Sequence, residues 1–148
     1  MVKPFALQSV FDLAQSRTDE ATLQLARLLS AERSAKDKLG LLQQYRDEYA
    51  ARFQQAAQNG LSPRQWNNYQ EFLGRIDEAI QAQGSVVTQH VGDTALGQTH
   101  WQQQNKKLKA FDVLSERHYS NENSKELKRE QKTQDEFAAR SIDIKESL

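Results

Sequence analysis

The side chains of this chain best suited to acid–base or metal chemistry are three histidines, His90, His100 and His118. None of them has a second histidine or a carboxylate at the spacing of a metal-binding helix such as HExxH, so we expect a structural role for each. The glycine-rich sequences that bind nucleotide phosphates, GxxxxGK[ST] and GxGxxG, do not occur. The sequence therefore predicts no catalytic residue, no metal site and no cofactor, and the chain is not expected to be an enzyme.

Composition favours long helices over a compact globule. The chain has 148 residues, of which 37% are hydrophobic and 27% charged, with a formal net charge of zero and no cysteine. The length allows one domain, but the sequence has few hydrophobic residues with which to form a core. Because positive and negative charges balance, no net electrostatic field attracts nucleic acid or an anionic membrane. The N-terminal residues lack the apolar region of a signal peptide, and no apolar run is long enough to span a bilayer. We expect a cytoplasmic protein.

A first long helix is indicated by apolar residues that recur every three and four positions from Leu7 to Ala56. Only Thr18, Glu32 and Arg46 interrupt this heptad pattern. Such spacing keeps one stripe of the helix facing a partner, as in a left-handed coiled coil. We predict a helix over residues 5–58, roughly 75 Å long at the usual rise per residue.

A hinge follows at residues 59–62. Asn59 and Gly60 tolerate the left-handed backbone that ends a helix. Ser62 then has the position of an N-cap, Pro63 that of the first helical residue, and Gln65 completes a capping box. A second long helix is predicted over residues 63–118, with a weaker heptad seam, followed by a charged tail over residues 119–148 that is partly helical or mobile.

Two long amphipathic helices joined by a short turn favour an antiparallel hairpin. We predict an all-α fold, a single coiled-coil domain over residues 1–148. The matching register places Phe53 opposite Tyr69, with Leu25 opposite Gly97 and Ala21 opposite Trp101, and brings Glu32 opposite His90 in a polar layer. The predicted seam consists of Leu28, Leu39, Leu42, Tyr49, Phe53, Trp66, Tyr69, Leu73 and Ile80.

One aromatic residue lies beside this seam. Phe72 occupies heptad position g and forms a ridge with Ile76, Ala79 and Gln83 along one edge of the second helix. A partly exposed aromatic residue in such a ridge is a usual anchor for recognition between helix and groove. Residues at g also commonly lap over the seam without binding anything, and the sequence leaves both interpretations open.

Three segments are similar to one known family: "LLQQYRDEYAARF", "NGLSPRQWNNYQEFLGRIDEAI" and, near the end, "QKTQDEFAAR". With Tyr45, Asn68 and the run Asp135 to Ala138, they resemble the flagellar FliJ family over nearly the whole chain. The resemblance implies a non-enzymatic cytosolic component of the flagellar type III export apparatus. It also implies an antiparallel two-helix coiled coil similar to the rotor shaft of rotary ATP synthases.

The resemblance also implies partners. The paired helix ends would dock in the hexameric ring of the flagellar export ATPase and promote its assembly and activity, through Phe11, Thr18, Ala21, Leu25, Trp101 and Leu108. The edge formed by Phe72, Ile76, Ala79 and Gln83 would contact the export gate membrane protein FlhA, although at Gln83 the family pattern suggests a histidine. Escorting of export chaperones is implied without assignable residues. The expected location is peripheral, on the cytoplasmic face of the inner membrane at the flagellar base.

Two other functions are compatible with the same pattern. One is a general export chaperone or coiled-coil adaptor that escorts flagellar substrates or chaperones and binds no ATPase. The other is a coiled coil associated with nucleic acid, suggested by Lys106, Lys107 and Lys109 near Trp101. Such binding would fall steeply with salt, and the acidic residues nearby argue against it.

Overall fold

The structure is a computed structural model that describes residues 2–147, and it consists of two α-helices joined by a short turn. Helix α1 spans Gln8–Asn59 and helix α2 spans Pro63–Glu146. No β-strand occurs in the described residues. The predicted all-α helical hairpin is confirmed. None of the described helical stretches combines the length and hydropathy that a membrane crossing requires.

The turn between the helices is built by the residues that predicted it. Gly60 has φ of +93°, a left-handed conformation that glycine adopts without strain. The Ser62 backbone N–H donates to Gln65 Oε1 at 3.0 Å, and the Gln65 backbone N–H donates to Ser62 Oγ at 3.2 Å. This reciprocal pair is a capping box, and it satisfies two donors that would otherwise lack partners at the start of α2.

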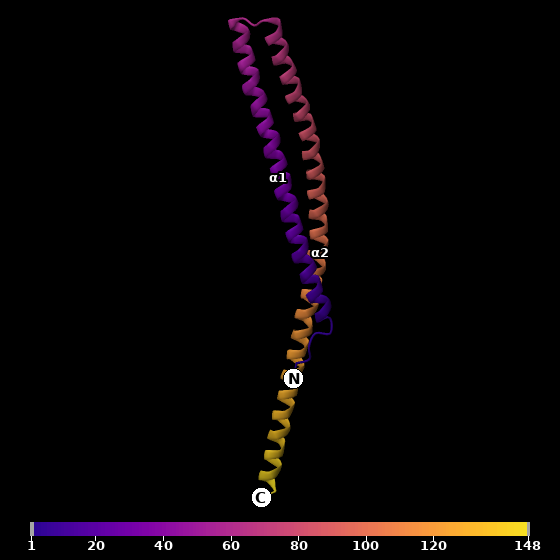
Figure 1. Ribbon diagram of the computed structural model, residues 1–148. Helices are drawn as coiled ribbons and strands as arrows, with labels where there is room; N and C mark the ends of the chain where they lie inside the picture. The colour runs from indigo at the N-terminus through magenta and orange to yellow at the C-terminus, as the bar shows by residue number, and fades with distance from the viewer. Residues whose placement is uncertain (1, 148) are drawn as a thin grey trace. The chain divides into compact units, whose positions relative to one another are not determined.

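Residue contacts divide the chain into two compact units, one comprising Glu20–Trp101 and the other the residues before and after it. In the unit Glu20–Trp101, α1 and α2 lie side by side and are joined at the hinge (Figure 1). Two hydrogen bonds cross between them, from Gln83 Nε2 to the Ala35 carbonyl at 3.0 Å and from Thr94 Oγ1 to the Leu28 carbonyl at 3.3 Å. Side chains of α2 thus bond the backbone of α1, which fixes the alignment of the two helices.

The alignment agrees with the register predicted from the heptads. The rings of Phe53 and Tyr69 are 5.3 Å apart, and the position of a Cβ on Gly97 would lie 3.8 Å from Leu25 Cδ1. Glu32 forms an ion pair at 3.7 Å with Lys36, one turn along its own helix, and its place opposite His90 stays a prediction.

In the other unit, Ala14 and Thr18 of α1 are buried. The Thr18 hydroxyl donates to the Ala14 carbonyl at 2.8 Å, which satisfies this polar group inside the seam. The sequence predicted a second helix over residues 63–118 followed by a partly helical or mobile tail, and in the structure α2 runs without a break to Glu146. The helix continues because no glycine or proline after Gly97 interrupts it. Alternating charges along this stretch also support an exposed helix.

Lys3 and Phe5, which precede α1, contact His118 of α2. Phe5 is buried, and its ring lies 5.6 Å from the ring of His118. His118 Nε2 lies 2.8 Å from the Lys3 carbonyl oxygen, and since a carbonyl only accepts, this nitrogen carries the hydrogen. His118 therefore holds the N-terminal residues in place, which is a structural role.

Gly97 differs from the five other glycines, because only here would a Cβ meet another side chain, colliding with Leu28 Cδ1. Gly74 lies in the same helix with nothing within 4 Å of the added atom. We predict that Gly74→Ala raises the free energy of unfolding by up to about 1 kcal/mol, the usual gain of alanine over glycine in a helix. Gly97→Ala should show no such gain, because Leu28 must leave its rotamer.

Thermal unfolding followed by circular dichroism of the two variants measures this difference. Equal melting temperatures for Gly74→Ala and Gly97→Ala would contradict the close approach of Leu28 to Gly97.

Candidate functional site

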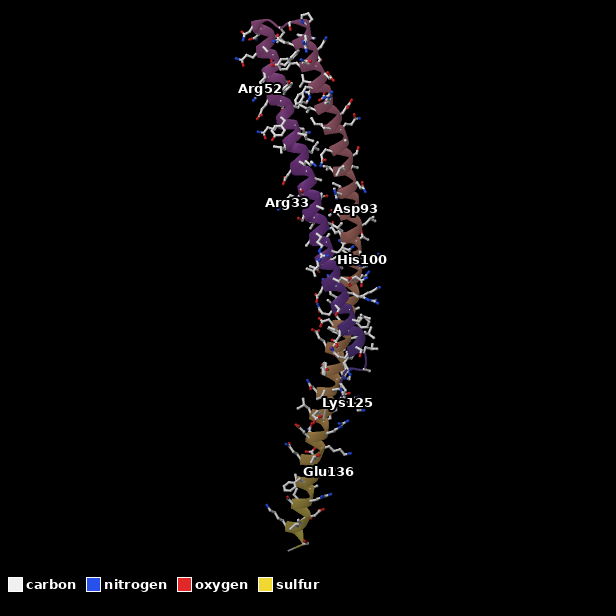
Figure 2. The ribbon with its side chains drawn as sticks, viewed as in Figure 1. Arg33, Arg52, Asp93, His100, Lys125 and Glu136 are labelled. Carbon is white, nitrogen blue, oxygen red and sulfur yellow. The ribbon has the colours of Figure 1, made fainter. Side chains whose placement is uncertain are left out.

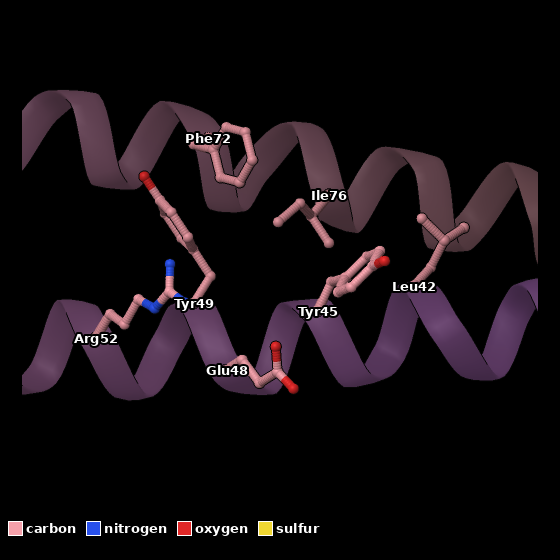
Figure 3. Close-up of a pocket in the computed structure, with 7 residues that line it drawn as sticks. All are labelled: Leu42, Tyr45, Glu48, Tyr49, Arg52, Phe72 and Ile76. Atoms are coloured by element: carbon pink, nitrogen blue, oxygen red, sulfur yellow. The ribbon is translucent and has the colours of Figure 1, made fainter.

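Near the hinge, an open groove of about 500 Å³ lies between α1 and α2. Figure 3 shows its walls, with five residues from α1 and two from α2. We call it the aromatic groove, and its lining residues are Leu42, Tyr45, Glu48, Tyr49, Arg52, Phe72 and Ile76. No residue outside Glu20–Trp101 contributes to it.

Phe72 stands at the centre of the α2 wall. Its ring centroid is 4.3 Å from that of Tyr49, which reaches across from α1, and Tyr49 also packs against Tyr69 at 5.2 Å. Even so, 44% of the surface of Phe72 remains exposed. Phe72 therefore laps over the seam and also leaves part of its surface open to solvent, and its role as a binding anchor stays a prediction.

The predicted ridge divides into two parts. Phe72 and Ile76 line the aromatic groove, whereas Ala79 and Gln83 lie beyond it. Ala79 is exposed, but Gln83 is half-buried, and its amide donates to the Ala35 carbonyl inside the hairpin. The Gln83 side chain is thus already occupied in holding the helices together.

The sequence reasoning missed the α1 wall. Tyr45 is half-exposed and, with Glu48 and Arg52, forms the side of the groove that faces Phe72 (Figure 3). Tyr45 and Arg52 fall at heptad position g of α1, as Phe72 does in α2. In an antiparallel pair, the g edges of the two helices lie on the same side. The g positions of Tyr45 and Arg52 therefore predict the second wall of the groove.

The chemistry of this groove suits a peptide segment. Tyr45, Tyr49 and Phe72 offer ring faces for an apolar side chain, while Glu48 and Arg52 provide an acceptor and donors at the rim. Elsewhere on the helices, Asp77 accepts a hydrogen bond from Arg46, and this bond and charge raise the pKa of the Arg46 guanidinium above its usual value. That pair links α1 to α2 on the surface.

The residues assigned to an ATPase ring lie in both units. In Glu20–Trp101, Ala21 is only 2% exposed, Leu25 is half-buried, and Trp101 Nε1 donates to Thr22 Oγ1 at 2.8 Å. In the other unit Thr18 is buried, and Phe11 and Leu108 are half-buried. These side chains face the partner helix, so most of the surface available to another protein belongs to the residues that flank them.

All the predicted seam residues except Trp66 are half-buried. Trp66, at the hinge, is exposed and packs against Phe53 with ring centroids 4.8 Å apart. Among the described residues, no group of three or more histidine, aspartate or glutamate side chains is placed to hold a metal ion.

Comparison with known proteins gives one consistent result. Residues 3–146 match the protein family described as the flagellar FliJ protein. The chain is similar to the flagellar FliJ protein of Salmonella typhi, with 28% identity over 141 residues that cover 95% of this chain and 96% of the relative. It is also similar to the flagellar FliJ protein of Escherichia coli (strain K12), with 26% identity over 141 residues and the same coverage.

Proposed function

Because this chain belongs to the flagellar FliJ protein family, a non-enzymatic component of flagellar export, we propose that it acts as a coiled-coil stalk of the export apparatus. It docks in the hexamer of the flagellar export ATPase, promotes assembly and activity of that ring, and links the ring to the export gate protein FlhA. The observation that carries this proposal is the family match over residues 3–146, which includes both the aromatic groove and the helix segments assigned to the ring.

The ATPase contact is supported by exposed apolar side chains near the start of α1. Leu7 just before α1, and Val10 and Leu13 within it, are exposed. Val113 and Leu114 of α2, in the same unit, are exposed as well. An apolar surface of this kind is typical of a docking site. These residues, which flank Phe11, Thr18 and Leu108, make the contact with the ring. ATP hydrolysis remains the task of the ring.

The contact with the export gate is supported by the aromatic groove. Its exposed Phe72 has the properties of an interface anchor, since the ring is large, partly exposed and held in place by Tyr49. Ile76 and Ala79 extend the same edge of α2. Gln83 contributes indirectly, because its amide donates to α1 and so holds the two helices in alignment.

Escorting of export chaperones belongs to the same proposal, with no residues assigned to it. The proposed location is the cytoplasmic face of the inner membrane at the flagellar base, where the protein is held by its partners. The alternative is a coiled-coil adaptor or export chaperone. It can be distinguished by experiment, because an adaptor leaves the assembly and activity of the ATPase ring unaffected.

We predict that the full chain raises ATP turnover and ring formation of purified flagellar export ATPase at low ATPase concentration. Leu13→Asp should reduce this stimulation by about tenfold, because a charge replaces an apolar contact. Leu41→Asp is the matched control, since Leu13 and Leu41 share heptad position c and are 48% and 47% exposed. Turnover and analytical ultracentrifugation provide the measurements.

A well-folded chain without effect on turnover would favour the adaptor. Equal loss of stimulation in Leu13→Asp and Leu41→Asp would reject the assignment of the ring contact to the α1 terminus.

For the gate, we predict that Phe72→Ala weakens binding to purified FlhA cytosolic region by about 1–3 kcal/mol, as expected for an anchor. Loss of the Tyr49 contact should cost the hairpin about 0.5–1.5 kcal/mol of stability, so circular dichroism must confirm a folded variant. Phe137→Ala, at an exposed phenylalanine of α2 outside the groove, is the control. Affinity is measured by titration calorimetry. If Phe72→Ala and Phe137→Ala bind with the same affinity, Phe72 has only a structural role.

A further inference from the structure

A run of weak helix-forming residues lies within α2, between the aromatic groove and Trp101. Residues 84–93 have the sequence GSVVTQHVGD, in which only Gln89 belongs to the group of strong helix formers. Glycine loses the most backbone entropy in a helix, and valine and threonine lose rotamer freedom there. The stretch is nevertheless helical throughout. We call residues 84–93 the weak segment.

Side chains at the start of the weak segment compete for the backbone carbonyls of α2. Thr88 Oγ1 donates to the Gly84 carbonyl at 3.0 Å, and Ser85 Oγ donates to the Gln81 carbonyl at 3.4 Å. A serine or threonine that bonds the carbonyl one turn before it weakens a helix and often bends it. A glycine next to a serine, as at Gly84 and Ser85, is also a common place for a kink. The local chemistry therefore favours opening of the helix here.

Packing against α1 gives the weak segment little support. None of its residues is buried, and Val87 is its only half-buried aliphatic residue, since Val86 and Val91 are exposed. Packing does not require the two glycines, because nothing lies within 4 Å of a Cβ added at Gly84 or Gly92. In proteins, most of the stability of a helix comes from packing of its apolar face. Helix propensity and packing are thus weak in the same stretch of α2.

The weak segment is bracketed by two hydrogen bonds from α2 side chains to the α1 backbone. Gln83, directly before it, donates to the Ala35 carbonyl, and Thr94, directly after it, donates to the Leu28 carbonyl. Thr94 is buried, so water does not compete with its bond. These two bonds keep α2 attached to α1 on both sides of the weak segment when the helix between them opens.

Helix α1 can follow a movement at this level without opening. Gly40 is the only glycine of α1, and it adjoins Leu39, which the heptad register places opposite Gln83. Nothing lies within 4 Å of a Cβ added at Gly40, so packing does not require glycine there. Residues 29–38, which the register places opposite the weak segment, are mostly leucine, alanine, glutamate, arginine and lysine, all strong helix formers. We expect α1 to bend here as an intact helix.

We propose that the weak segment is a conformational joint of the hairpin. Its helical hydrogen bonds open while the bonds from Gln83 and Thr94 hold the register. The hinge end, which carries the aromatic groove, thereby changes its angle to the part of the hairpin near Trp101. Figure 2 labels Arg52 near the hinge and Asp93, the last residue of the weak segment, further along the hairpin. The joint follows from helix propensity and packing and does not rest on the proposed function.

Amide hydrogen exchange of the full chain, followed by NMR, measures the opening. Protection factors remove the intrinsic differences in exchange between residue types. They should be about tenfold lower in the weak segment than in residues 73–82 and 95–101 of the same helix. Helices fray from their ends, so a minimum inside α2 is not expected of a uniform helix. Equal protection in the three stretches, or protection that changes steadily along α2, would overturn the proposal.

Substitution of the glycines tests the cause of the opening. Gly84→Ala and Gly92→Ala should each raise the protection factors of the weak segment by about fivefold, because alanine forms helix better than glycine. Gly74→Ala is the matched control, since it lies in the same helix and nothing is within 4 Å of its added Cβ either. It should leave the weak segment unchanged. An equal rise in all three variants would reject a local joint.

A distance measurement tests the bending itself. The chain has no cysteine, so Asn68→Cys and Gln98→Cys, at exposed positions of α2, place spin labels on either side of the weak segment. Double electron–electron resonance should give a broad distance distribution that narrows when Gly84→Ala and Gly92→Ala are combined. Gly74→Ala lies in the same interval and should leave the width unchanged. A width that stays the same in the combined variant would show that the weak segment is not a joint.

Discussion

Within Glu20–Trp101, each helix has only the other helix against which to bury its apolar side chains, and many features of the molecule follow from this constraint. A two-helix pair covers one narrow stripe, so the buried hydrophobic side chains of the paired helices are alanines such as Ala21 and Ala35, while the larger seam residues stay half-buried or, at Trp66, exposed. Stability must then accumulate layer by layer along the seam, because no layer contributes as much as a globular core does.

A thin seam also changes the role of polar residues. In a globular core Thr94 and Gln83 would be costly to bury, but here each donates to a backbone carbonyl of α1. Apolar contacts between the helices allow neighbouring registers at similar energy, whereas these hydrogen bonds form in one register only. The aromatic groove depends on that alignment, since it requires Tyr45 and Tyr49 to stand opposite Phe72 and Ile76.

Local patterns in the sequence predicted the features that depend on local chemistry. The capping box at Ser62 and Gln65 and the opposition of Phe53 and Tyr69 followed directly from residue types and heptad spacing. The full extent of α2 did not, because the loss of a seam after residue 118 predicted a tail that is only partly helical or mobile, although helix propensity does not require a partner. The bond from Gln83 to Ala35 depends on a side-chain rotamer across two helices, which heptad positions do not specify. The wall at Tyr45 and Arg52 follows from their g positions once the antiparallel register is applied to both helices.

The capped hinge has a consequence for the order in which the chain folds. Contacts between the helices join residues that are increasingly remote in sequence with distance from the hinge, from 31 positions for Arg46 and Asp77 to 79 for Thr22 and Trp101. Closing a short loop costs less entropy than closing a long one. We therefore expect the two helices to pair from the hinge outward. During synthesis, most of the chain must be made before the segment that pairs with its first residues exists.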